Sequence, residues 1–203
     1  GAMAETVRRV IADNPTIRPG DVFVTNDPYR GGSHLPDITV VTPVHGEDSE
    51  ILFFTASRAH HAELGGISPG SMQPFSRNLA EEGVLIRNFK LVDAGSARWN
   101  AFRDLLSAGA YPTRSIEANL ADVAAQVAAN HRGAGDLARL VQRYTLPVVT
   151  AYMRHIQTAA EQKVRASLKR IAPGDYPFVD HLDDGTRIAV TVSVDGDHAT
   201  IDF

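Results

Sequence analysis

The sequence predicts an α+β fold: an N-terminal antiparallel sheet with glycine-rich loops, a long helical hairpin packed on it, and a C-terminal β-hairpin. Three observations carry this prediction. Two β-rich runs flank a turn at residues 45–50, apolar residues recur at helical spacing between residues 115 and 171, and alternating runs flank the Asp195-Gly196 turn.

The first part of the chain predicts one helix, three strands and a long loop. Residues 5–12 carry an apolar stripe at i, i+3, i+4 that ends before Pro15. The strands are expected at residues 22–25, 38–42 and 51–57, and the last two form a hairpin. Residues 61–78 hold too many glycines and prolines for a regular element, so we expect an ordered loop of the kind that carries function.

The second part predicts helices over residues 115–171, broken near Gly133 and Gly135 and restarted or kinked at Pro147. Their regular stripe predicts buried side chains at Ile116, Leu120, Val123, Leu140, Tyr152 and Ile156. The closing hairpin is expected from strands 187–194 and 198–203.

These elements suggest a division of the chain. Gly1 and Ala2 before Met3 are typical of a remnant left by an expression tag, so residues 1–3 are set aside. Residues 4–172 would form one region with the sheet, the loops and the long helices. Residues 173–203 would begin a further β-rich region that is cut short, so we expect the chain to be part of a larger protein.

Composition excludes several classes of protein. The chain has no cysteine, so a disulfide scaffold, a thiolate zinc site and a cysteine nucleophile are excluded, and a reducing cytoplasm is expected. A net charge of -4 without a basic run argues against nucleic-acid binding. No run of 18 apolar residues predicts a membrane span, and no signal peptide is recognisable.

The sequence lacks two common kinds of functional loop, one that binds nucleotides and one that carries a catalytic serine. Neither glycine-rich nucleotide motif is present, so any ATP is expected to bind another domain. The Gly-x-Ser-x-Gly elbow of serine hydrolases is absent as well, which leaves Ser71 in a loop as a weak nucleophile candidate.

A group of histidines and carboxylates flanks the predicted hairpin. His34 and Asp37 precede its first strand, and His60, His61 and Glu63 follow its second. A turn centred between residues 47 and 48 gives paired numbers that sum to 95, which places His34 opposite His61 and Asp37 opposite Arg58. Because strand side chains alternate, one of the two adjacent histidines is expected to be a ligand and the other a support.

Two imidazoles and one or two carboxylates from loops are typical of a metal site for zinc, manganese or iron with open positions for substrate. The alternative is that the histidines cap strand ends and bond loop carbonyls. His131, His155 and His198 lie in regular patterns without carboxylate partners, so they are expected to be ordinary surface or core residues.

Three motifs in order resemble the hydantoinase B/oxoprolinase family. They are PGDVFVTNDPY at residues 19–29, GGSHLPD at 31–37 and ASRAHHAELGGISPGSM at 56–72. That family includes B subunits of ATP-dependent hydantoinases, the C-terminal half of 5-oxoprolinase and α subunits of acetone carboxylase-like enzymes. Its members are more than twice as long as this chain.

The resemblance implies a metal-bearing subunit that works with an ATP-binding, hydantoinase A-like partner. The partner would phosphorylate the substrate carbonyl or enol, and ring opening of a cyclic amide or carboxylation of a ketone would follow. His34, Asp37 and one of His60 or His61 would bind the metal, and Asp27 and Glu63 would lie near it in catalytic roles. The family usually has aspartate where Glu63 stands, which weakens a direct role for that residue.

We therefore expect a cytoplasmic fragment of a cyclic-amide hydrolase that is inactive alone and assembles as a hetero-oligomer. A ketone carboxylase subunit is the alternative within the family. A non-catalytic segment whose helices dock a partner subunit is the alternative outside it.

Overall fold

The computed structural model describes residues 2–203, and the chain forms two compact units, one ending at Ala138 and the other spanning Arg139–Phe203. The predicted α+β class is confirmed, with one antiparallel sheet in each unit. No helix within residues 2–203 has the length and hydropathy that crossing a bilayer requires. The expected division near residue 172 stays a prediction.

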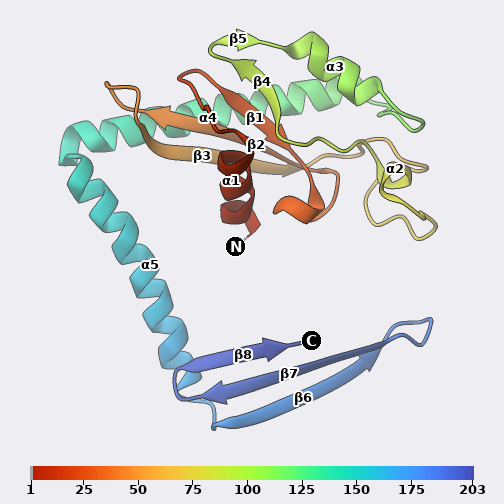
Figure 1. Cartoon of the computed structure of the whole chain (residues 1–203), viewed down its shortest axis with the longest axis vertical. Helices are drawn as coiled ribbons and strands as arrows, with labels where there is room; N and C mark the ends of the chain where they lie inside the picture. The colour runs from red at the N-terminus through yellow and green to blue at the C-terminus, as the bar shows by residue number, and fades with distance from the viewer. Residues whose placement is uncertain (1) are drawn as a thin grey trace. The chain divides into compact units, whose positions relative to one another are not determined.

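The first unit is built on a five-stranded antiparallel sheet in the order β3-β2-β1-β4-β5 (Figure 1). Its strands are β1 (Val22–Thr25), β2 (Asp37–His45), β3 (Ile51–His60), β4 (Phe89–Asp93) and β5 (Ser96–Ala97). β-Branched and aromatic residues fill the three strands that the sequence predicted, and such side chains suit a pleated, buried surface.

Two helices, α1 (Ala2–Asp13) and α4 (Ile116–Tyr144), cover opposite faces of this sheet. The other helices of this unit are the short 3-10 helix η1 (Pro28–Arg30), α2 (Leu79–Glu82) and α3 (Trp99–Ser107). Val10 of α1 packs with Phe23 and Val41 on one face. The other face carries the main core, in which Val40 and its neighbours pack with Val123 of α4. Alternation along β2 therefore sends odd-numbered residues toward α1 and even-numbered residues toward α4.

The hairpin of β2 and β3 differs in register from the prediction. Asp37 pairs with His60 and Thr39 with Arg58, so paired numbers sum to 97 rather than 95. The backbone N of Gly46 donates to the carbonyl of Glu50, and Ser49 has a left-handed φ of 63°, so the turn lies one residue later than expected. A bulge at Val44/His45 precedes this turn. A slip of two residues leaves every side chain on its expected face but changes its partner.

Helix α4 runs unbroken through Gly133 and Gly135, so the predicted break there is wrong. A glycine inside a helix costs only about 1 kcal/mol, which a long helix packed on a sheet tolerates. The chain breaks instead at Thr145, whose φ of 70° ends α4. Pro147 then lies in the first turn of α5, as expected for a restarted helix.

The second unit contains helix α5 and a three-stranded sheet. Its elements are α5 (Leu146–Leu168), β6 (Gly174–His181), β7 (Arg187–Asp195) and β8 (His198–Asp202), with sheet order β6-β7-β8. The predicted hairpin of residues 187–203 is confirmed as β7 and β8, with a third strand, β6, added to it. Strand β6 was not predicted, because its region contains Pro173, Gly174 and Pro177, which are typical of turns.

The predicted burial of the helical stripe is correct only in part. Val123 is fully buried and Ile116 and Leu120 are half-buried, but Leu140, Tyr152 and Ile156 are exposed. Periodicity shows which side chains share a helix face, whereas burial depends on what covers that face.

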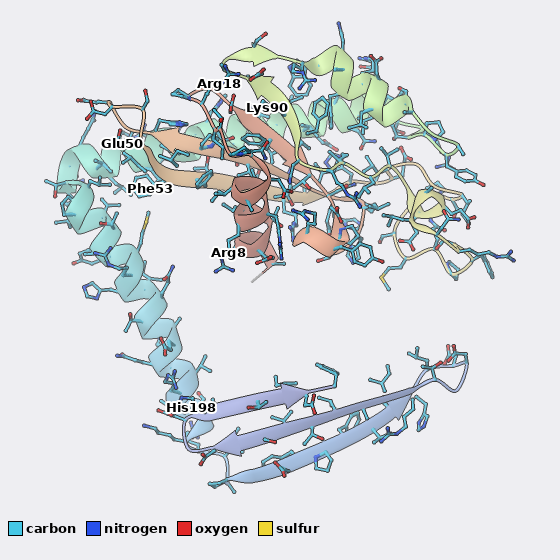
Figure 2. All side chains as sticks on the ribbon, in the orientation of Figure 1. Arg8, Arg18, Glu50, Phe53, Lys90 and His198 are labelled. Atoms are coloured by element: carbon cyan, nitrogen blue, oxygen red, sulfur yellow. The ribbon has the colours of Figure 1, made fainter. Side chains whose placement is uncertain are left out.

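Asp21 fastens the start of β1 to the end of β4. Its buried carboxylate accepts hydrogen bonds from the backbone N of Arg18 at 2.9 Å, from Nζ of Lys90 at 3.0 Å and from the backbone N of Ala94 at 2.8 Å. Figure 2 shows Arg18 and Lys90 at this end of the sheet. Burial raises the pKa of Asp21, but these bonds outweigh it and hold the pKa below its ordinary value.

Candidate functional site

Three of the predicted ligands meet at one end of the β2–β3 hairpin, on the face that α1 covers. Asp37 is the first residue of β2, its register partner His60 is the last residue of β3, and His34 lies in the loop just before β2. The observed register brings His60 to Asp37, where the predicted register placed Arg58. We call His34, Asp37 and His60 the triad.

The triad is compact enough to share one ion. Each residue offers a ligand atom, and these atoms lie within 4.8 Å of one another. Nδ1 of His34 is 2.9 Å from Oδ2 of Asp37, and Nδ1 of His60 is 2.8 Å from Oδ1. The two rings stand edge to face with centroids 5.4 Å apart. Asp37 is mostly buried, while 38% of the His34 side chain and 48% of the His60 side chain are exposed, so the site opens to solvent.

Nδ1 of His34 distinguishes this group from an ordinary ion pair. The atom is shielded from solvent and makes no hydrogen bond, although it lies 2.9 Å from Oδ2 of Asp37. A buried polar atom without a partner is costly, and a cation between the imidazole and the carboxylate would satisfy both. Two imidazoles with one carboxylate also match the ligands of a facial metal site.

Arg58 holds the scaffold behind the triad. It lies two residues before His60 on the same face, and its Nε donates to Oγ1 of Thr39 at 2.7 Å. Its Nη2 donates to Oγ1 of Thr6 and to the carbonyl of Gly31, both at 2.8 Å. Arg58 thereby joins β2, β3, α1 and the loop that leads to His34.

Gly31 is a position where only glycine fits. Its φ is 90°, and a Cβ there would lie 2.4 Å from the backbone N of Thr6. The glycine-rich loop therefore approaches α1 more closely than any side chain would permit.

His61 lies away from the triad, on the face covered by α4. The residue is 1% exposed, with Nδ1 2.7 Å from Oδ1 of Asn119 and Nε2 3.3 Å from Oε1 of Gln126. In the described residues, the group with metal-ligand spacing contains His60 and not His61. The two adjacent histidines thus lie on opposite faces, as strand alternation predicts, and the split into a ligand and a support stays a prediction.

Glu63 fastens the long loop to the start of α4. Its carboxylate accepts hydrogen bonds from Oγ1 of Thr113 and from the backbone N of Gly65, Arg114 and Ser115, the last three at 2.7 to 3.0 Å. Burial raises the pKa of Glu63, but these bonds outweigh it and lower the pKa overall. A carboxylate so fully bonded, at a helix N-terminus, is a structural clamp.

Asp27 is buried where β1 leads into η1. Oδ1 accepts from the backbone N of Tyr29 at 3.0 Å, and Oδ2 accepts from Nε of Arg87 at 2.8 Å. With Asp13, Tyr29, Arg30 and Arg87 it lines a polar hollow of about 430 Å³. Charged and phenolic groups in one hollow can bind a polar small molecule.

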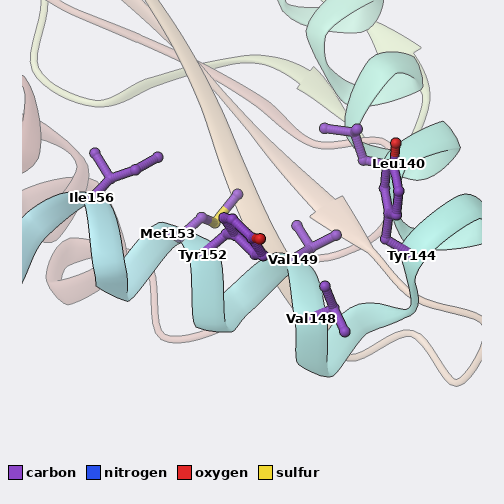
Figure 3. A pocket seen from close by; sticks show the side chains of 7 residues that line it. All are labelled: Leu140, Tyr144, Val148, Val149, Tyr152, Met153 and Ile156. Carbon is purple, nitrogen blue, oxygen red and sulfur yellow. The ribbon is translucent and has the colours of Figure 1, made fainter.

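A second hollow has a different character. It occupies about 590 Å³ in the second unit and is almost wholly apolar (Figure 3). It is lined by Leu140, Tyr144, Val148, Val149, Tyr152, Met153 and Ile156. Tyr144 and Tyr152 contribute phenolic hydroxyls to it, and its other lining side chains are aliphatic or thioether groups.

A row of amides on α4 was missed in the sequence. Asn119, Gln126 and Asn130 are buried with Val123 on one face of the helix. Gln126 donates to the carbonyls of Ile38 and Ser57, and Asn130 donates to the carbonyls of Val40 and Thr55. The signal was present as three amides at helical spacing, but hydrophobic periodicity gives such positions no weight.

Comparison with known proteins gives the same family that the sequence motifs resemble. The sequence profile of the family described as Hydantoinase B/oxoprolinase matches residues 1–203. The chain is 41% identical over 231 residues to 5-oxoprolinase 1 of Arabidopsis thaliana, covering 100% of this chain and 18% of that protein. It is 31% identical over 212 residues to the B-type subunit of a putative D-/L-hydantoinase from a Pseudomonas species, covering 97% of this chain and 34% of that protein.

A solved structure shows the same fold. The ATP-dependent caprolactamase from Pseudomonas jessenii matches with a TM-score of 0.86 at 27% identity, covering 99% of this chain and 35% of that chain. The present chain thus spans about a third or less of the length of these relatives.

Proposed function

Because the chain belongs to the hydantoinase B/oxoprolinase family, we propose that its parent protein is the metal-bearing component of an ATP-dependent hydrolase of cyclic amides. Oxoproline, hydantoin and caprolactam, after which the relatives are named, each contain a cyclic amide. The family relationship therefore supports the substrate class, and the identity of the amide is left open.

The observation that carries the proposal is the triad. His34, Asp37 and His60 would hold a divalent ion of zinc, manganese or iron, because their ligand atoms lie within 4.8 Å and Nδ1 of His34 has no other partner. When bound, such an ion supplies Lewis acidity toward a carbonyl or phosphoryl oxygen. Arg58 keeps the strand ends in register, so the ligands keep their spacing.

The other two candidates take positioning roles in this proposal. Glu63 acts as a positioning residue, because four donors already occupy its carboxylate. Asp27 is a positioning residue beside the polar hollow, because its side chain is fully buried and its two oxygens accept from Tyr29 and Arg87.

ATP would be bound by a partner. The chain has no glycine-rich phosphate loop, and the related hydantoinase component is named as one lettered subunit of its enzyme, which supports a hydantoinase A-like subunit or domain as that partner. The caprolactamase is ATP-dependent by name. An enzyme that consumes ATP is expected in the cytoplasm, where ATP is abundant.

The test compares variants of the full-length parent protein assayed with its ATP-binding partner. We expect His34→Ala to abolish both bound metal, measured by elemental analysis, and amide-dependent ADP release, while thermal unfolding changes little. His131→Ala, an exposed position on α4, is the matched control and should leave all three readouts unchanged.

Two outcomes would contradict the proposal. Full activity in His34→Ala would remove the metal assignment. Loss of activity with unchanged metal content would make His34 a proton-transfer or substrate-contact residue instead.

A further inference from the structure

The second unit, Arg139–Phe203, has almost no core of its own. Val149 and Val194 are its buried apolar side chains among the described residues, at 8% and 5% exposure. A unit of this size normally needs a full hydrophobic core, a metal or disulfides to be stable.

The three-stranded sheet has one mainly apolar face, which also carries Asp180, and one mainly polar face, which also carries Val179. Register places Tyr176, Val192 and Ile201 side by side, followed along the same face by Phe178, Val190 and Ile188. The opposite face carries Asp175, Thr191, Ser193, Thr200 and Asp202. Such alternation is typical of an antiparallel sheet packed on one side.

The apolar face is nonetheless bare over most of its length. Phe178 and Ile201 are 63% and 62% exposed. At the end of the sheet next to α5, Val194 of this face is buried, and on the opposite face His198 contacts Arg165 at 2.9 Å (Figure 2). The first half of α5 likewise carries exposed apolar side chains, among them Tyr152 and Ile156, which Figure 3 shows in the lining of the apolar hollow.

The two edges of the sheet differ. β6 contains Pro177, which cannot donate a backbone hydrogen bond and is found on edge strands. β8 has neither proline nor lysine, the residues that usually block an open edge. β8 is therefore the edge of this sheet that can more readily accept a further strand.

We propose that a segment of the parent polypeptide outside residues 1–203 pairs with β8 and packs over the apolar face of this sheet. The relatives provide the chain length, since the matched part is 34% of the hydantoinase subunit and 35% of the caprolactamase chain. A segment of the same polypeptide also loses no translational freedom when it docks.

Area argues against a second copy as the occupant. Three strands about 4.8 Å apart, with about eight residues rising about 3.3 Å each, present roughly 400 Å². Stable complexes bury about 800 Å² per partner, so this face alone is too small to hold a dimer.

The absence of cysteine from residues 1–203 makes a labelling test clean. Ile201→Cys on the apolar face and Thr200→Cys on the polar face are made in the full-length parent protein, and N-ethylmaleimide labelling is followed by peptide mass spectrometry. We expect Ile201→Cys to react at least about tenfold more slowly, at low and high protein concentration and without the partner subunit.

Three results would overturn the proposal: equal labelling rates, protection only at high concentration, which indicates a second copy, or protection only with the partner subunit. Hydrogen exchange in the unmodified parent protein guards against a variant that misfolds. The outward-facing amides of β8 should be protected there, and rapid exchange at β8 would equally contradict a continuing sheet.

Discussion

His60 and His61 are neighbours in sequence and opposites in environment. His60 reaches Asp37 on the α1 face of the first sheet and is about half exposed. His61 is buried on the α4 face between Asn119 and Gln126. The imidazole of His60 is therefore accessible to a ligand, whereas that of the next residue, His61, is buried and hydrogen-bonded within the fold.

The two faces of the sheet use polar residues differently. On the α4 face, Glu63, Asn119 and Gln126 are buried with partners for their polar atoms. On the α1 face, the triad is open to solvent and leaves Nδ1 of His34 without a hydrogen bond. Satisfied networks rigidify a fold, whereas an unsatisfied group at an open site is free to bind.

The largest effect should come from the clamp on the α4 face. Glu63→Ala leaves the hydroxyl of Thr113 and three backbone N–H groups without their acceptor. We expect the unfolding free energy to fall by roughly 3–5 kcal/mol in chemical denaturation of the parent protein. Glu47→Ala, in the exposed hairpin turn, is the control. A loss below about 1 kcal/mol would mean that Glu63 is not a clamp.

Substitution of the two adjacent histidines should affect stability and metal binding in opposite ways. His61→Ala should lower the unfolding free energy by roughly 2–3 kcal/mol, because Asn119 and Gln126 lose a buried partner. His60→Ala should leave metal-free stability within about 0.5 kcal/mol and weaken metal binding by about 100-fold or more, measured by calorimetric titration. The reverse pattern would exchange the roles of the two residues.

Acid should weaken the first unit through its buried carboxylates. Hydrogen bonds hold the pKa values of Glu63 and Asp21 below their ordinary values of 4.5 and 3.8. The unfolded chain then binds more protons, so both groups stabilise the fold above those values and lose that contribution as pH falls through the folded-state pKa.

Denaturation curves measured between about pH 5 and pH 3 test this expectation. Glu63→Gln should flatten the pH dependence by up to about 1.4 kcal/mol per pH unit, since one fewer group takes up a proton on unfolding. An unchanged slope would show that Glu63 titrates alike in both states.

The smallest effect contrasts two glycines. Gly133 lies inside α4, where an added Cβ would make an ordinary 3.4 Å contact with Thr55, so Gly133→Ala should raise the unfolding free energy by up to about 1 kcal/mol. Gly31→Ala should lower it instead, since φ is 90° and Thr6 blocks the Cβ. Thermal melts of the two variants that shift in the same direction would break the comparison.

The sequence by itself determined the strands of the first hairpin, the restart of the helix at Pro147, and the gathering of His34, Asp37 and one of the two adjacent histidines at one hairpin end. These features rest on local backbone preferences and on the period-two alternation of strands, which neighbouring residues encode. The family followed from three motifs in order, and the sequence profile bears it out.

Only the tertiary structure decided the individual partners and the burial. The register of β2 and β3 depended on the position of the Gly46–Glu50 turn. The buried face of α4 carries amides that donate hydrogen bonds to β2 and β3. Tyr152 and Ile156 share a helix face with apolar neighbours but are exposed. A periodic pattern reports which side chains face one way, but their partners come from residues far along the chain, so spacing alone cannot reveal them.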